Sequence, residues 1–183
     1  MTFGPVVLAG EPLVIPSVSG RRDASHAVRI DPQDLENFNA RSSVYQRMGR
    51  FEEAVQDQTE LIDKFRQHRD DSNLHQALNN RAYFRALGEF ELDQALDDIQ
   101  QAILLWAQDY SAESPSYLDT RGYIQYLLGN IEEAEKDLSR ATELAKKEHA
   151  IVADRTDGDG GDVFYDAAGV PAALATGLAE LAP

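Results

Sequence analysis

The densest group of potential metal ligands is a set of four aspartates between residues 157 and 166. Calcium prefers closely spaced carboxylate oxygens, and a helix–loop–helix calcium site requires an acid at loop position five, glycine at six and glutamate at twelve. Counted from Asp157, those positions hold Gly161, Asp162 and Ala168. The spacing therefore fails, and we expect a solvated acidic linker instead of a metal site.

The histidines and the absence of cysteine argue against catalysis. None of the four histidines has a metal-ligand spacing, and the chain contains no nucleophile or phosphate-binding motif. His68 and His75 fall in or beside a polar connecting segment, where we expect them to be solvated. We therefore predict a protein that is not an enzyme and that has no catalytic residue, metal or cofactor. The enzyme alternative is an atypical active site in a long polar loop.

Charge and hydropathy restrict the possible partners. The chain has 183 residues, enough for one domain, and its 32 acidic and 17 basic residues give a net charge of −15. An acidic surface opposes nucleic-acid binding, which needs basic contacts to phosphate, and it weakly favours a basic or neutral partner. No apolar run is long enough to span a membrane, and the apolar N-terminal segment lacks the positive start of a signal peptide. We expect a cytoplasmic location by default.

An internal repeat organises the middle of the chain. Three windows align at a 40-residue offset: FNARSSVYQRMGRFEEA from Phe38, LNNRAYFRALGEFELDQA from Leu78 and LDTRGYIQYLLGNIEEA from Leu118. Each has an apolar anchor, an Arg three residues later, a small residue next, a Gly near a turn and then an Ala that begins a second periodic segment. Apolar spacing of three and four residues on both sides of the turn predicts two helices in each unit.

The predicted boundaries follow from turn and capping residues. Asp31-Pro32 and Ser114-Pro115 are typical helix starts, and Gly49 and Gly129 suit the left-handed end of a first helix. The predicted segments are an irregular N-terminal arm at 1–30, repeats at about 31–70, 71–112 and 113–149, an acidic Gly-rich linker at 150–168 and a short helix at 169–183.

The three windows resemble the tetratricopeptide repeat, a helix–turn–helix unit with a period of about 34 residues. The resemblance is nearest in the third window, and the second has a lengthened turn. It implies an all-α fold, an α-solenoid of three repeats, whose first helices line a concave groove that binds a peptide or protein segment. The longer period predicts longer second helices or looser connections between repeats.

The resemblance also indicates which side chains face the groove. Amides can bond a peptide backbone as donor and acceptor, and Tyr rings add flat contact area. The predicted groove residues are Asn39, Ser43, Arg47, Asn79, Asn80, Tyr83, Asp119, Thr120, Tyr123 and Tyr126.

Some members of this family hold a C-terminal carboxylate with a clamp of Lys, Asn and Arg. The basic positions of that clamp hold Asn39, Ser116 and Thr120 here, and Asn80 alone matches. We therefore expect a partner protein or peptide of another class.

Three recurring arginines, Arg41, Arg81 and Arg121, have two interpretations. They could form a basic ladder for an acidic ligand. Alternatively, they stabilise the repeats by pairing with acidic residues of the following helix, such as Glu52-Glu53 and Glu132-Glu133.

The C-terminal segment carries an apolar stripe at Val170, Leu174, Leu178 and Leu181. A solenoid exposes an apolar face at each end unless a cap covers it, so the stripe predicts a capping helix. A segment that occupies the protein's own groove is the second interpretation, and a disordered tail is the third. Self-association through the solenoid ends is the alternative to partner binding as a function.

Overall fold

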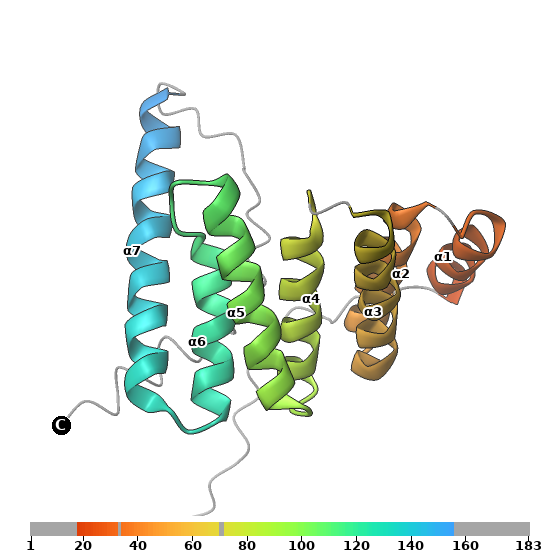
Figure 1. The fold of residues 1–183 in the computed structure, drawn as a ribbon, viewed down its shortest axis with the longest axis horizontal. Coiled ribbons are helices and arrows are strands. Elements are labelled where there is room, and N and C mark those ends of the chain that lie inside the picture. Colours follow the sequence, from red (N-terminus) through yellow and green to blue (C-terminus); the bar gives the residue numbers. More distant parts are fainter. Residues whose placement is uncertain (1–17, 33, 70–71, 156–183) are drawn as a thin grey trace, which may run out of the picture.

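The computed structural model describes residues 18–32, 34–69 and 72–155, which form seven α-helices in a row (Figure 1). The helices are α1 (Val18–Ile30), α2 (Leu35–Arg47), α3 (Phe51–His68), α4 (Leu74–Leu87), α5 (Leu92–Asp109), α6 (Pro115–Leu127) and α7 (Ile131–Arg155). The most extensive contacts are those of the hairpins α2–α3, α4–α5 and α6–α7, and α3–α4 and α5–α6 join successive hairpins. The chain is therefore an α-solenoid, as the repeat pattern predicts.

The ends of the described region differ from the sequence prediction. Residues 18–30 form a helix instead of the irregular arm, because α1 packs on α2 and buries Val28. The Asn37 amide donates to the carbonyl oxygens of Ala27 and Asp31 at 3.5 and 3.3 Å and so holds this corner. Helix α7 continues to Arg155, past the predicted end at residue 149, because no glycine or proline occurs before Gly158. The predicted C-terminal helix lies outside the described residues.

Local signals set the other boundaries. Pro115 occupies the first turn of α6 as predicted, whereas α2 starts three residues after Pro32 and is capped by Asp34, whose carboxylate accepts from the Glu36 N–H at 3.0 Å. Gly49 and Gly129 end α2 and α6 with φ of 69° and 81°, where glycine avoids the steric cost of a side chain. In the longer turn after α4, Glu89 and Glu91 adopt the left-handed conformation instead.

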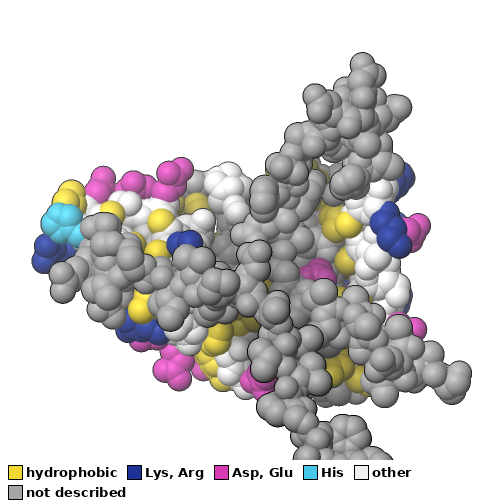
Figure 2. Space-filling model, turned by 180° about the vertical axis from the view of Figure 1, so that it is seen from behind, with side chains coloured by type: hydrophobic (Ala, Val, Ile, Leu, Met, Phe, Trp, Pro, Cys, Tyr) yellow, Lys and Arg dark blue, Asp and Glu magenta, His cyan; other side chains and the backbone are white. Residues whose placement is uncertain are grey.

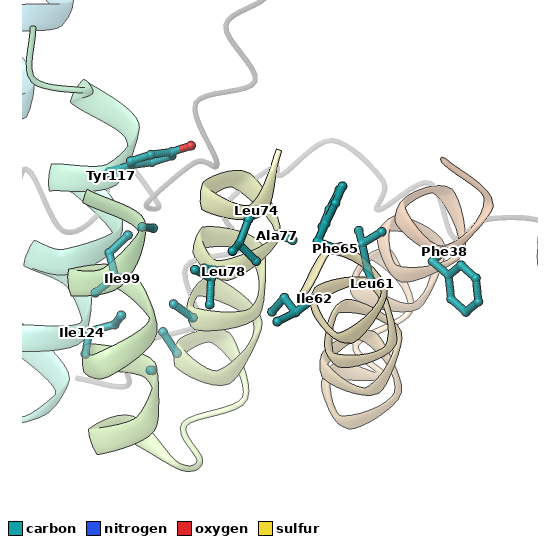
Figure 3. Packing of buried hydrophobic residues seen from close by; sticks show 14 of the residues in the cluster. Phe38, Leu61, Ile62, Phe65, Leu74, Ala77, Leu78, Ile99, Tyr117 and Ile124 are labelled. Atoms are coloured by element: carbon teal, nitrogen blue, oxygen red, sulfur yellow. The ribbon is translucent and has the colours of Figure 1, made fainter. Parts of the chain in front are cut away.

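The larger of two apolar core clusters runs from α1 to α6 (Figure 3). Its centre is formed by large side chains with no exposed surface, namely Ile62, Leu78, Ile99 and Ile124. Each hairpin also buries an alanine near the start of its second helix. These small residues let the two helices of each hairpin approach closely. Among the described residues, no helix has the length and apolar character to cross a membrane.

Candidate ligand-binding groove

Each hairpin is joined by an ion pair between its two helices. A guanidinium on the first helix binds both oxygens of a buried aspartate on the second. The pairs are Arg41–Asp57, Arg81–Asp98 and Arg121–Asp137. In the second and third pairs all four N–O distances are 2.6–2.7 Å. Bidentate geometry at buried carboxylates explains why Arg recurs at this position. We name these three pairs the arginine staples.

The staples support the pairing interpretation of the recurring arginines and correct its partners. The predicted acids Glu52, Glu53, Glu132 and Glu133 lie in the first turn of their helices, one turn before the aspartates that bind. Glu53 pairs instead with Arg50 beside it. The signal that sequence reasoning missed is the Asp that follows each Arg by 16 or 17 residues. These arginines are therefore committed to internal pairs and form no free basic ladder.

A groove of about 350 Å³ opens between the first two hairpins. Its apolar wall comes from Leu61 and Phe65 of α3 and Ala77 of α4, which lie together in Figure 3. Four amides, Asn39, Asn73, Gln76 and Asn80, surround it, and its remaining lining residues are Leu35 and Glu36. The groove exists because α2 packs only slightly on α4, whereas α4 packs directly on α6. The lining is thus mainly apolar and amide, with the carboxylate of Glu36 among it.

Two predicted groove residues are brought together here. The Asn39 side-chain oxygen accepts from the Asn80 amide at 3.3 Å and from the Gln58 amide at 3.1 Å. Gln58 also donates to Ser42 Oγ at 2.6 Å, and its own oxygen has no partner within the described part of the chain. These bonds orient the amides, so the remaining donors and acceptors of Asn39 and Asn80 face the groove in fixed positions.

The other predicted groove residues separate into two groups. Asn79, Tyr83 and Thr120 are buried, with exposed fractions of 8, 6 and 1%, and the Thr120 hydroxyl donates to the Ser116 carbonyl oxygen inside its own helix. The remainder keep some exposed surface; they are Ser43, Arg47, Asp119, Tyr123 and Tyr126. The first group shows that a helical face read from periodicity includes side chains that neighbouring helices cover.

An aromatic cluster at one end of the core corrects the expectation for His75. Its ring is buried, 6% exposed, and a 2.6 Å hydrogen bond joins His75 Nδ1 to Tyr117 Oη. Trp106 and Tyr110 stack beside it with ring centroids 3.8 Å apart. Burial lowers the pKa of His75 and raises that of Tyr117. The His75–Tyr117 pair joins α4 to α6 and is part of the core. The polar residues around His75 in the sequence therefore do not predict its burial.

Among residues 18–32, 34–69 and 72–155, no group of three or more His, Asp or Glu side chains could hold a metal ion. The four aspartates at 157–166 lie outside these ranges.

Comparison with known proteins assigns two of the three hairpins to a family. A model of the tetratricopeptide repeat matches residues 35–63 and 115–148, which cover α2 with most of α3, and α6 with most of α7. The chain contains tetratricopeptide repeats. Such repeats generally mediate protein–protein interaction and are typically not enzymes. The hairpin α4–α5 lies outside the matched residues, so a third tetratricopeptide repeat and a 40-residue period stay predictions.

The crystal structure of BtubC (BKLC) from P. vanneervenii is similar in fold, with a TM-score of 0.59 and 14% sequence identity. The match covers 70% of this chain, which spans 56% of that chain. At this identity the likeness extends to the arrangement of helices alone. No curated protein matches this sequence.

Proposed function

We propose that this chain is a non-enzymatic interaction module that binds an extended peptide or protein segment across α2, α4 and α6. The single observation that carries the proposal is the groove between α2 and α4, with an apolar wall and a hydrogen-bonded amide pair. Amides recognise a peptide backbone independently of its sequence, and the apolar wall accepts a neutral side chain. A basic flank of the partner would complement the net charge of −15.

The decisive experiment blocks the groove without breaking its internal hydrogen bonds. Gln76 is exposed at the rim, so Gln76→Trp fills the opening while Asn39 and Asn80 stay paired. A partner is captured with the wild-type chain, its binding segment is mapped to a synthetic peptide, and affinity is measured by calorimetry. We expect a loss of at least about tenfold for Gln76→Trp.

The matched control is Gln108→Trp, which places the same ring at an exposed position of α5. Melting temperatures of both variants show whether the repeats remain folded. Equal affinity of the wild type and Gln76→Trp for the mapped peptide would remove the groove as the binding site.

A further inference from the structure

The first helices place three oxygen acceptors at one repeated position. Asn39, Asn79 and Asp119 are 40 residues apart, and each directly follows the buried apolar anchor of its helix. The Asn39 oxygen receives two amide donors. In contrast, the Asn79 oxygen has no donor within the described ranges although the side chain is only 8% exposed. Asp119 likewise makes no hydrogen bond or ion pair with any described residue. Two neighbouring helices thus carry acceptors that lack donors.

Contacts on α6 define the side to which Asp119 belongs. Arg121 and Gly122 face α7, because one pairs with Asp137 and the other packs on Leu138. Tyr117, one turn before Arg121, contacts His75 of α4 and Trp106 of α5. At about 100° per residue, Asp119 points about 160° away from both Tyr117 and Arg121. Tyr123 and Tyr126, four and seven residues later, share the face of Asp119, and all three side chains are partly exposed.

The electrostatics of this face favour a cation. Burial raises the pKa of Asp119 to about 6, whereas the staple aspartate Asp137 is neutralised by a guanidinium. Burial and the nearby Glu89 carboxylate raise the pKa of Tyr123. Glu89 belongs to the turn after α4, so acidic groups from two elements act on the same face. A desolvated carboxylate without a counterion costs stability, and such sites are typical of ligand recognition.

We propose that Asp119, with Tyr123 and Tyr126, binds an arginine side chain of the partner polypeptide. A guanidinium pairs with a carboxylate and stacks on Tyr rings in the same pose, which an ammonium cannot do equally well. The net charge of −15 adds long-range attraction for a basic segment.

This site deepens the proposed function and rests on it for the source of the arginine. Packed helices lie about 9 Å apart, so α6 is roughly 15 Å from the middle of the groove between α2 and α4. An extended chain advances about 3.3 Å per residue. The partner therefore carries its arginine about four or five residues from the segment seated between α2 and α4.

The test uses N-acetyl-arginine methylamide as the probe and N-acetyl-glutamine methylamide as its neutral counterpart. Both are titrated into the ¹⁵N-labelled full chain, and amide shifts give the affinity and its location. We expect the arginine probe to shift the amides of α6 around Asp119 and Tyr123. Asp119→Asn should weaken this binding at least about fivefold, and Tyr123→Leu should weaken it as well.

The matched control is Asp97→Asn, which removes the same charge from an exposed position of α5. An equal loss in both aspartate variants, or equal shifts with the glutamine probe, would overturn the site. The two proposals fail separately. If Gln76→Trp weakens peptide binding but Asp119→Asn leaves the probe affinity unchanged, only the arginine site is wrong. If the probe binds at Asp119 but Gln76→Trp leaves the peptide affinity unchanged, only the groove proposal is wrong.

Discussion

Aspartates in this chain have opposite environments that depend on a single neighbour. Asp98 is nearly buried and receives guanidinium groups from Arg81 and Arg85, so its charge is compensated. Asp119 is partly desolvated and has no counterion among the described residues. Compensated buried carboxylates are structural elements of the fold, because removing one partner leaves an isolated charge. An uncompensated one lowers stability.

The stability cost of Asp119 predicts a pH-dependent gain for Asp119→Asn. Its folded-state pKa of about 6 lies above the ordinary value of 3.8, so its contribution is most favourable below pH 3.8 and is lost as pH rises through about 6. We expect the variant to raise the free energy of unfolding at pH 7.5 by about 1–2 kcal/mol, allowing for partial exposure. The gain should vanish near pH 4. Urea unfolding followed by circular dichroism at both pH values measures it.

Asp97→Asn serves as the control, since its exposed carboxylate should give no comparable gain at either pH. A loss of stability for Asp119→Asn at pH 7.5 would mean that the carboxylate has an internal role that the structure does not contain.

At the scale of the helices, close approach is controlled by the small residue after each staple arginine. The three hairpins carry Ser42, Ala82 and Gly122 there, each buried against its partner helix. A Cβ on Gly122 would lie 2.8 Å from Leu138 Cγ and 3.2 Å from Asp137 Cβ. The contact between α6 and α7 therefore leaves little room for a side chain at position 122, although an alanine is accommodated at the equivalent position in α4–α5.

Gly122→Ala is therefore expected to destabilise the protein even though alanine has the higher helix propensity. Displacing Leu138 and the staple partner Asp137 should lower the free energy of unfolding by about 1–3 kcal/mol. Chemical unfolding measured by circular dichroism gives the value. Ser139→Ala, on the exposed side of α7, should change it little. A more stable Gly122→Ala protein would show that Leu138 moves aside without cost.

Sequence periodicity predicted the helices well where local signals coincide. Pro115 and the left-handed Gly49 and Gly129 mark real boundaries, because each restricts the backbone by itself. The helix at α1 could not be predicted with equal ease, since its main anchor is the single buried Val28. For the staples, the pairing of each arginine with the following helix was one of two predictions, but the aspartate partners were not predicted. Helical phase fixes that Arg41 faces the second helix, but which carboxylate it meets depends on how two helices cross.

The groove shows the same limit at a larger scale. Asn39 and Asn80 could be placed on one side of the repeats from spacing alone. The hollow between them depends on the wider separation of α2 and α4, which no residue pattern in either helix indicates. The burial of Asn79 and of His75 similarly depends on neighbours that are distant in the sequence.

At the scale of the whole molecule, Figure 2 shows a surface of mixed side-chain types. The ends of the solenoid are the places where an uncovered apolar surface is expected. Acidic, basic and hydrophobic side chains are interspersed over the visible described surface. Large apolar side chains are exposed at Ile30 of α1 and Ile131 of α7, the first and last described helices. Stacked repeats require covered ends, so additional segments of the chain or a second copy would affect stability here.

Removal of residues 156–183 tests the predicted C-terminal cap. Helix α7 ends at Arg155, so the cut leaves every described helix complete. We expect a lower melting temperature and concentration-dependent self-association, because an apolar end would lose its cover. Circular dichroism and light scattering, run on the full and shortened chains, measure both. An unchanged melting temperature with a monomer at all concentrations would mean that the segment is no cap.

The arginine staples also affect how such a chain can be lengthened or shortened during evolution. Each staple closes within one hairpin and crosses no boundary between hairpins. Duplicating a hairpin would copy an intact ion pair, and deleting one would leave no orphaned charge behind. A change in the number of hairpins therefore requires compensating substitutions only in the apolar surfaces between hairpins. Such surfaces tolerate substitution more readily than buried charges do.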